Sequence, residues 1–359
     1  MIDYGVGPQH DEAELIIFGP GFGEAIAVHL GEGNWLLVDS CLDEERKEPA
    51  SSRYLDSIGV LPDSVKTIVA SHWHDDHVRG ISKLAEKYSA AEFYLPAVFN
   101  DKEGAEFLEA YSGTAAPQTR GSHELFKAVR SRAVVMPAQA RTIVFQENLN
   151  GLPARVVAMS PSPAAFGRSL AHMLSYIPRS TSVPINHAPE LKPNLEAIVL
   201  HVDLGHESLL LGSDLEDAQG LGWTAMLADR ICSALPQSSV FKVAHHGSET
   251  GHHDGIWNKL LQSEVISVLT PFNHGKHRLP NPGDRVRLLN RSSQAYISSD
   301  ATRKPAMPGA QEKRLGDVLK NMSRVNSGFG AVRLRKRRSE SSWRVELFGA
   351  AQPIVAQAA

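Results

Sequence analysis

A short stretch rich in histidine, SHWHDDHVRG at residues 71–80, carries side chains well suited to metal chemistry. Its donors follow the pattern H-x-H-x-D-H, and they are His72, His74, Asp76 and His77. Imidazole nitrogens and carboxylate oxygens bind zinc and similar divalent ions at about 2.0–2.2 Å. Residues two apart on an extended chain point the same way, so His72 and His74 can chelate one ion. Asp76 and His77 lie past the expected strand end, where the chain can turn and bind a second ion beside the first.

A plain alternative exists for this stretch. Asp76 can cap the start of a helix within an ordinary polar loop. That reading would explain one histidine, but it does not explain three histidines and an aspartate at this spacing. We therefore favour a metal site.

Further candidate ligands follow two other apolar runs. SLLLGSD ends at Asp214, whose carboxylate can bridge two ions, and VFKVA is followed by His245 and His246. We expect His245 to be the ligand because it comes first off the strand, and His246 to support it. An aspartate after a strand is by itself typical of a turn, so Asp214 gains weight as a ligand only beside the first cluster.

Strands that alternate with helices must position these side chains. The expected strands cover 14–19, 24–31, 34–40, 65–70, 141–147, 154–160, 196–204, 208–214, 240–244, 265–271 and 294–300, with a last hairpin around 330–348. Apolar residues at helical spacing from Val78 predict a helix that leaves the site. Segments 97–140 and 161–195 are rich in Ala, Ser, Pro and charge, and we interpret them as irregular insertions. The order predicts an α/β fold with two sheets face to face and helices outside, as a single domain over 1–359.

Composition excludes several classes of protein. The chain has 359 residues, of which 42% are hydrophobic and 21% charged, as in globular proteins. Its formal net charge of -3 excludes a basic surface over the whole molecule, and its 2 cysteines exclude a disulfide framework. The amino terminus lacks the pattern of a signal peptide, and no run approaches the ~20 apolar residues that span a bilayer. We expect a cytoplasmic protein that does not bind membranes.

The motifs together carry a family resemblance. SHWHDDH, LLLGSD and KVAHHGSE, in this order, resemble the metallo-β-lactamase superfamily of metal-dependent hydrolases. More narrowly, HHGS resembles the soluble hydrolase domain of bacterial competence (DNA-uptake) channel proteins and its free-standing relatives. GPGFGEAIAVHL and NWLLVDS resemble the family's opening strands, with Asp39 at its early aspartate. SVLTPFNHGKHRLPNP followed by AYISSD resembles a late segment near the site, and the likeness spans roughly residues 14–348.

The resemblance implies a metallo-β-lactamase fold, an αββα sandwich with metals at one edge of the two sheets. In that arrangement His72 and His74 hold the first ion, and Asp76 and His77 hold the second. Asp214 then bridges the two ions, and His245 completes the second site. Asp39 supports the ligands from behind, because metal ligands need partners that orient them.

One departure from the family concerns the first ion. Many members place a further histidine on it, between the Asp-His pair and the bridging aspartate. No histidine of this chain lies at a strand end there with the expected flanking glycine, and the competence-type subgroup carries a polar residue near the position of Asn194. The first site is then weakly held or completed by water, and a one-metal enzyme stays open as an alternative.

The expected chemistry is hydrolysis by metal-bound hydroxide. A divalent ion lowers the pKa of its water from 15.7 to ~7, so no serine or cysteine nucleophile is needed. Asp76 takes part as a metal ligand, and His277 in KHRLPNP is our candidate for the acid that protonates the leaving oxygen. A surface histidine in a proline-rich loop is the alternative for His277. Zinc suits the ligands best, and manganese also accepts them.

Local charge points to the substrate. Alternation along the last hairpin places Arg333, Arg335 and Arg337 on one face, where we expect them to contact phosphates of a nucleic acid. Further basic residues lie upstream, at Arg303, Lys304, Lys313, Arg314, Lys320 and Arg324. A solvated hairpin with alternating charges is the alternative. Two metals about 3.5–4 Å apart also suit phosphodiesters.

The leading interpretation is a metal-dependent hydrolase of phosphodiesters, a nuclease, that uses two divalent ions. One alternative is a hydrolase of a small ester, lactone or cyclic nucleotide, because fold does not settle substrate. Another is a non-catalytic, metal-stabilised binding or regulatory subunit, which the retained Asp76 and Asp214 disfavour. The resemblance is compatible with a partner protein in a bacterial defence system, but no motif of this sequence indicates one.

Overall fold

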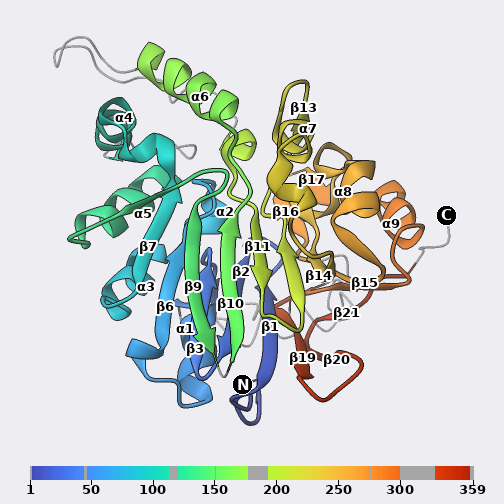
Figure 1. Cartoon of the computed structure of the whole chain (residues 1–359). Coiled ribbons are helices and arrows are strands. Elements are labelled where there is room, and N and C mark those ends of the chain that lie inside the picture. Colours follow the sequence, from blue (N-terminus) through green and yellow to red (C-terminus); the bar gives the residue numbers. More distant parts are fainter. Residues whose placement is uncertain are drawn as a thin grey trace, which may run out of the picture.

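Two sheets stacked face to face form the body of the protein. The computed structural model describes residues 2–43, 47–112, 120–149, 151–176, 193–274, 276–299 and 328–355. Each sheet has eight strands. Figure 1 shows α3 (Ile81–Lys87) and α5 (Arg120–Arg130) outside one sheet, and α8 (Asp254–Lys259) and α9 (Pro282–Leu289) outside the other. The predicted αββα sandwich is confirmed.

The first sheet joins the amino-terminal strands to the last hairpin. Its order is β20 (Arg344–Gly349), β19 (Gly330–Arg337), β1 (Glu12–Gly19), β2 (Ala25–Gly31), β3 (Asn34–Val38), β6 (Val65–Val69), β7 (Glu92–Pro96) and β8 (Met136–Ala138). The strands from β20 to β3 are antiparallel neighbours, and those from β3 to β8 run parallel. β19 is therefore an interior strand of this sheet, between β20 and β1.

The second sheet is built from the later part of the chain. Its order is β21 (Gln352–Pro353), β18 (Gln294–Ile297), β15 (Leu261–Leu269), β14 (Ser238–Lys242), β12 (Ser208–Leu211), β11 (Leu200–Asp203), β10 (Leu152–Ala158) and β9 (Ile143–Leu149). β12, β14, β15 and β18 run parallel, so their carboxyl ends reach the same edge. Most strands in both sheets agree with the ranges expected from the sequence, apart from shifts of a few residues at their ends. The sequence did not predict β7, β8 or β21.

The strands are almost continuously apolar because both faces of each sheet are covered. Along β1, Leu15 and Ile17 belong to the core between the two sheets. Their neighbours Ile16 and Phe18 face the other way and belong to the core under the helices of the first sheet. A third core lies between the second sheet and its helices, around Trp223. Because both faces of each sheet are covered, polar side chains that could contact a ligand are expected at the edges of the sheets.

Helices connect and cover the strands. Besides those named above they are α1 (Ala50–Ser57), α2 (Asp75–Val78), α4 (Lys102–Ser112), α6 (Pro163–Tyr176) and α7 (Gly222–Leu227). The expectation that 97–140 and 161–195 are irregular is wrong where they are described, because these segments contain α4, α5 and α6. Phe107 and Leu125 are buried on the apolar faces of α4 and α5, which their Ala- and Ser-rich composition obscured. Within the described ranges, no helix has the length and apolarity needed to cross a bilayer.

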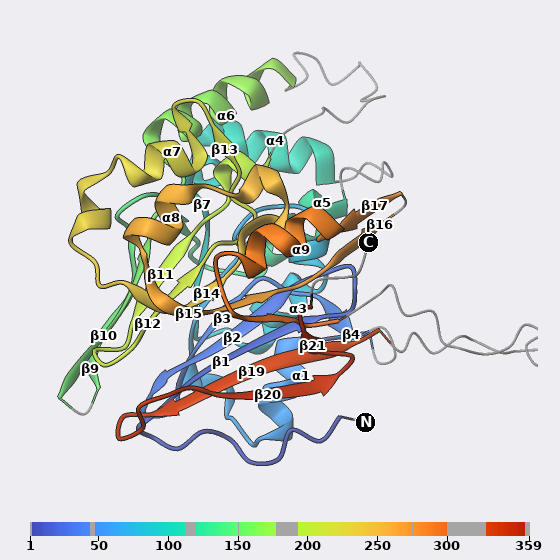
Figure 2. The same ribbon diagram turned by 90° about the vertical axis from the view of Figure 1, so that its right-hand side faces the viewer.

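Short hairpins lie outside the two sheets. They are β16 (Phe272–His274) with β17 (His277–Leu279), and β4 (Leu42–Asp43) with β5 (Glu48–Pro49); a further short strand is β13 (Asp217–Ala218). Figure 2 shows the β16–β17 hairpin projecting near α5 and α9. The hairpin follows β15 directly, so it starts at the edge where the parallel strands of the second sheet end.

Candidate metal centre

Strand ends from both sheets meet at one edge of the sandwich. Asp39 follows β3, and the histidine motif follows its parallel neighbour β6 and continues into α2. Asp214 follows β12, and His246 follows the parallel strand β14. Carboxyl ends of parallel strands share an edge, and such edges are common ligand sites in α/β proteins. The Ser213 hydroxyl donates to Ser71 Oγ at 2.7 Å, which ties the two strand ends together across the sheets.

Four buried side chains from three segments converge at this edge. Asp76, His77, Asp214 and His246 each offer one ligand atom, and these atoms lie within 4.8 Å of one another. His246 Nε2 lies 3.1 Å from Asp76 Oδ2 and 3.2 Å from Asp214 Oδ2. His77 Nε2 lies 3.3 Å from Asp214 Oδ1. The structure thus brings together three residues predicted as ligands and His246, which we expected only to support them.

Two atoms of this group indicate what it is suited to bind. His77 Nε2 and Asp214 Oδ1 are buried, yet neither has a hydrogen-bond partner among the described residues. Buried polar atoms of folded proteins are nearly always paired, and exceptions often mark an ion or a functional site. Two imidazole nitrogens and two carboxylate oxygens at this spacing are a donor set typical of zinc and similar divalent ions. The cluster therefore fits a divalent metal.

The charges of the cluster also favour a cation. Burial alone would raise the pKa of Asp214, but the imidazoles of His246 and His77 outweigh it and hold that pKa well below its usual range. Burial likewise opposes a charged His246, but Asp214 and Asp76 raise its pKa to about 9. The same carboxylates raise the pKa of His77 against the effect of its burial. The carboxylates thus hold positive charge on two imidazoles, and a metal ion would displace those protons on binding.

Asp39 occupies the place expected for a residue that orients a ligand. Its Oδ2 accepts a hydrogen bond of 2.7 Å from His77 Nδ1, which leaves Nε2 of that ring directed at the cluster. The backbone N–H and the hydroxyl of Ser71 each donate to Asp39 at 2.7 Å. Asp39 adopts a positive φ of 59°, which turns the chain sharply after β3. With its oxygens engaged in this way, Asp39 supports His77 and is not itself a free ligand.

His72 and His74 form a second, less complete pair of donors. His72 Nε2 lies 3.2 Å from His74 Nδ1, so the two imidazoles point at a common place, as the two-residue spacing predicts. Burial lowers the pKa of both histidines, which keeps them neutral and able to bind a metal. His72 also forms a second group of buried donors with His77 and Asp39, and its ring centroid lies 4.2 Å from that of His77. Among the described residues, no histidine from the chain between His77 and Asp214 belongs to either group. This agrees with the gap in the first site that the sequence indicated.

Asn194, expected near that gap, lies within reach of the centre without facing these two histidines. It is buried in the short turn that precedes β11, and its Nδ2 donates to Glu216 Oε1 at 2.9 Å. The same nitrogen lies 3.3 Å from His245 Nε2. Its Oδ1 is buried without a hydrogen-bond partner among the described residues. Asn194 therefore helps to position His245 and Glu216 on the wall of the cleft.

The structure exchanges the roles expected for the two adjacent histidines. His246, and not His245, points at Asp76 and Asp214, while His245 Nδ1 lies 2.8 Å from the Thr250 hydroxyl at the cleft wall. The reason is a left-handed turn after β14, in which φ is 47° at His245 and 52° at His246. Such a turn rotates the first residue outwards, so the rule that the first side chain after a strand faces the site fails here.

A charged pair supports the centre from inside the sandwich, and the sequence interpretation missed it. Lys242 and Glu24 are fully buried, and Lys242 Nζ lies 2.7 Å from Glu24 Oε1. The same ammonium donates to the Ser213 carbonyl at 2.8 Å and lies 3.7 Å from Asp214 Oδ1. It thereby holds the turn that presents Asp214. The signal available in the sequence was a lysine within the apolar run VFKVA.

The centre opens onto a large cleft. The cleft has a volume of about 980 Å³, and Asp76, Asp214 and His246 line it. His277, our candidate acid, also lines it from β17 and is exposed. The sequence interpretation named no other residue of this hairpin, although its loop carries two further cations.

The predicted phosphate-binding face on the last hairpin is wrong for two of its three arginines. Arg333 is 3% exposed and makes two hydrogen bonds to Glu346, at 2.8 and 2.9 Å. Arg335 is 6% exposed and pairs with Glu14. β19 lies inside the sheet, so the face that alternation identified is covered by the Tyr4 segment and α1. Arg337 is exposed. The upstream basic residues Arg303, Lys304, Lys313, Arg314, Lys320 and Arg324 lie outside the described residues.

Comparison with known proteins finds one family model and several solved structures that resemble this chain. A family model described as the metallo-beta-lactamase superfamily matches residues 18–165, which include the histidine motif. No curated protein matches the chain. A solved structure with a similar fold is the metallo-beta-lactamase fold protein YhfI from Bacillus subtilis, with 11% identity and a TM-score of 0.42 over 80% of this chain and 95% of that one. Another is the metallo-beta-lactamase SMB-1, with 14% identity and a TM-score of 0.36 over 67% and 81%.

Proposed function

We propose that this chain, with its match to the metallo-β-lactamase superfamily, is a metal-dependent hydrolase that cleaves phosphodiesters and acts as a nuclease. The observation that carries the proposal is a cluster of metal-type donors beside an open cleft of about 980 Å³ with cations on its rim. The rim cations are Arg79, Lys276 and Arg278. A phosphodiester needs both elements, because it carries a negative charge and resists attack without electrostatic assistance.

The donors divide into groups with different tasks. Asp76, His77, Asp214 and His246 would hold a divalent ion, and His72 with His74 would hold a second one more weakly. A bound divalent ion supplies a nucleophile at neutral pH, because it lowers the pKa of water from 15.7 to about 7, and it stabilises charge on phosphoryl oxygens. Zinc suits this donor set best, and manganese also accepts it.

The remaining residues prepare the site. Asp39 fixes the ring of His77 through Nδ1, and Lys242 holds the turn before Asp214. Such supporting contacts set ligand geometry and affinity. His277 lies exposed at the cleft, where its imidazole can hand a proton to the leaving oxygen. His277 is thus assigned as the general acid.

Two finer expectations from the sequence belong to this proposal. The narrower likeness to the hydrolase domain of competence channel proteins rests on HHGS and the late proline-rich segment. It favours a polynucleotide over the small esters, lactones and cyclic nucleotides that other interpretations allow. A cytoplasmic location and a partner protein in a defence system stay predictions.

The test is a substrate and metal screen on the purified chain. Bis-p-nitrophenyl phosphate, labelled DNA and RNA oligonucleotides, nitrocefin and a thioester are each incubated with zinc, manganese or a chelator. We expect diester and oligonucleotide cleavage that requires a divalent ion and that Asp214→Asn abolishes. Metal-dependent cleavage of nitrocefin or the thioester alone would replace the proposed substrate class, and no turnover of any substrate with any ion would reject an enzyme.

A further inference from the structure

The β16–β17 hairpin places aromatic and basic side chains directly beside the metal centre. Phe272, His274, Lys276, His277 and Arg278 all line the same cleft as Asp214. In the hairpin register Phe272 pairs with Leu279, and His274 pairs with His277. Paired residues share a face of a hairpin, so the two histidines and Phe272 lie on one side. The metal cluster does not use this surface.

Three neighbouring rings along this side, Phe22, Phe272 and His274, form a cluster that we call the platform, although their planes are tilted by 33° to 69° to one another. The ring centroids of Phe22 and His274 are 4.9 Å apart, and those of Phe22 and Phe272 are 5.4 Å apart. Phe272 in turn lies 5.3 Å from the ring of His246. The platform therefore starts at a candidate metal ligand and extends outwards into the cleft.

The platform is held in place and stays accessible. The backbone N–H of Asn273 donates to the Gly21 carbonyl at 2.8 Å, which fixes the hairpin to the segment that carries Phe22. Phe22 and Phe272 are only half-buried, and His274 is exposed. Aromatic rings that a monomer leaves accessible inside a charged cleft are suited to stacking with a flat ligand.

Cations lie on the same hairpin as the rings, with Lys276 in its loop and Arg278 opposite Asn273 on the other face. Lys276 and Arg278 are exposed, and neither makes an ion pair with any residue that the structure describes. Stacking rings combined with unpaired cations are the usual means of binding single-stranded nucleic acid, since every base has an aromatic face and every link has a phosphate.

We propose that Phe22 and the β16–β17 hairpin form a subsite for single-stranded polynucleotide beside the metal centre. One base stacks on an accessible ring of the platform, and the flanking phosphates contact Lys276 and Arg278. The inference rests on the proposed nuclease function and adds which nucleic acid is bound and where. A duplex does not fit this description, because its bases are already stacked.

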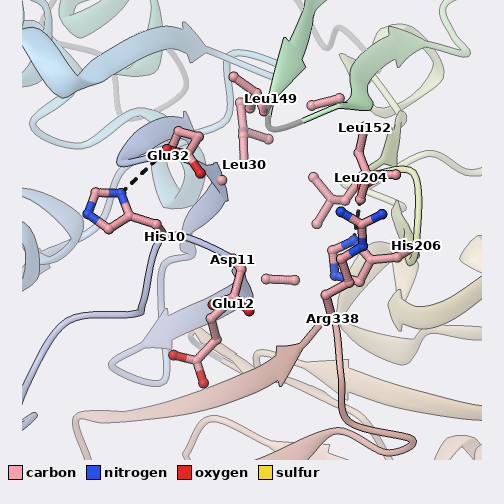
Figure 3. Close-up of a pocket in the computed structure, with 13 residues that line it drawn as sticks. His10, Asp11, Glu12, Leu30, Glu32, Leu149, Leu152, Leu204, His206 and Arg338 are labelled. Carbon is pink, nitrogen blue, oxygen red and sulfur yellow. Dashed lines mark hydrogen bonds and ion pairs between the residues drawn. The ribbon is translucent and has the colours of Figure 1, made fainter.

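A second cavity provides a matched control. Figure 3 shows this cavity, in which Arg338 lies beside His206 and near Leu204. Its lining also includes the carboxylates Asp11, Glu12 and Glu32. Arg338 is exposed, like the hairpin cations, but it shares its cavity with three acidic side chains. Arg338→Gln therefore removes one exposed cation without touching the hairpin.

The experiment measures binding without turnover. Fluorescein-labelled single-stranded DNA is titrated with protein in a chelator, anisotropy is read at several salt concentrations, and a probe with one abasic link and a duplex are run in parallel. The variants are Phe22→Leu, the pair Lys276→Gln and Arg278→Gln, and the control Arg338→Gln. A circular dichroism spectrum of each variant confirms that the fold is kept.

Removing a ring and removing the cations are expected to change the salt dependence of binding in different ways. Loss of the platform ring should weaken binding by about 5- to 150-fold with little change in salt dependence, and this loss should shrink on the abasic probe. Loss of the two cations should weaken binding and reduce the log–log salt slope by about 1.4, or ~0.7 per contact. Arg338→Gln should bind like the unchanged protein.

Several results would overturn the inference. One is an unchanged affinity of Phe22→Leu for single-stranded DNA. Another is a salt slope that the pair Lys276→Gln and Arg278→Gln leaves unaltered. A third is duplex DNA that binds as tightly as single-stranded DNA. Because binding is measured in chelator, these results do not depend on activity. Failure of the proposed function would appear separately, as absence of hydrolysis in the metal screen.

Discussion

Two hairpins of this protein carry clustered basic residues, yet their environments are opposite. In β19–β20, Arg333 and Arg335 are buried and paired with Glu346 and Glu14. In β16–β17, the cations border the cleft and make no ion pairs within the described ranges. β19 is an interior strand whose arginines face a helix, whereas β16–β17 stands outside both sheets.

The difference shows that the density of cations along a sequence does not identify a binding surface. What matters is whether each charge already has a partner. The acidic groups differ in their hydrogen bonds, since Glu14 accepts from Arg335 and the Tyr54 hydroxyl. Asp214 Oδ1 lies near the cations of His77 and Lys242 but accepts no hydrogen bond from the described residues. Satisfied charges hold the fold together, and unsatisfied ones mark the place where a ligand is expected.

The largest expected effect comes from removing an unsatisfied group. Asp214→Ala deletes a carboxylate that faces both His77 and His246, so we expect hydrolysis to fall by several orders of magnitude while the sheets stay folded. Turnover of bis-p-nitrophenyl phosphate and a circular dichroism spectrum measure the two parts. Asp63→Ala, which removes an exposed carboxylate far from the centre, is the control. Near-normal turnover in Asp214→Ala would show that the centre has been misplaced.

Removing a satisfied charge should affect stability and not chemistry. Arg335→Met leaves Glu14 buried without its guanidinium, and breaking a buried ion pair on one side costs about 3–5 kcal/mol of unfolding free energy. Urea denaturation measures this loss, and the added change Glu14→Gln should recover part of it. If Arg335→Met instead keeps its stability but loses affinity for polynucleotide, the contrast between the hairpins is wrong.

A smaller effect, on metal affinity, is expected from changing the residue that orients His77. Asp39→Asn weakens the acceptor for His77 Nδ1, and loss of such a contact commonly costs about 10- to 100-fold in metal affinity. Competition with a chromophoric zinc chelator measures the dissociation constant directly. Ser57→Ala, which alters a local contact on α1, should leave that constant unchanged. Equal affinity in Asp39→Asn would mean that His77 does not need this support.

The smallest effect concerns a buried carboxyl outside both clusters. Burial raises the pKa of Glu196 to about 8, and its Oε2 lacks a hydrogen-bond partner among the described residues. The folded state thus holds a proton that the unfolded state has lost, so stability falls as pH rises from 4.5 through 8. Between pH 7 and 8 the loss is about 1 kcal/mol, since one pKa unit corresponds to about 1.4 kcal/mol.

Urea denaturation at pH 6, 7 and 8 tests this dependence. Glu196→Gln should remove the loss between pH 7 and 8, because the amide does not titrate. An unchanged pH dependence in Glu196→Gln would assign the loss to other groups.

Much of the fold followed from the sequence, because apolar runs of strand length alternate with helical spacing and one histidine motif lies at a strand end. The order of strands within each sheet did not follow from local patterns. The segments 97–140 and 161–195 were predicted wrongly because α4, α5 and α6 pack on other helices and turns rather than directly on a strand, so their apolar residues follow no strand in the sequence.

The sequence predicted the histidine motif of the site, but it did not predict which of His245 and His246 faces the cluster or which arginines are exposed. His72, His74, Asp76 and His77 are close in sequence, so spacing alone brings them together. The exchange of His245 for His246 depends on positive φ angles, which are uncommon for residues other than glycine and which the sequence pattern does not predict. Alternation correctly grouped Arg333 with Arg335, but whether that face is solvent or core depends on segments more than 270 residues away in the chain, such as Tyr54.

Whether the buried histidine and aspartate cluster is a functional metal centre can be decided by measuring the metal content of the protein. Elemental analysis of protein purified without chelator should give at least one divalent ion per chain, and Asp214→Ala should lose most of it. Removing the ion should abolish hydrolysis, and adding zinc or manganese should restore it. A metal-free chain that is fully active and insensitive to chelators would contradict the account.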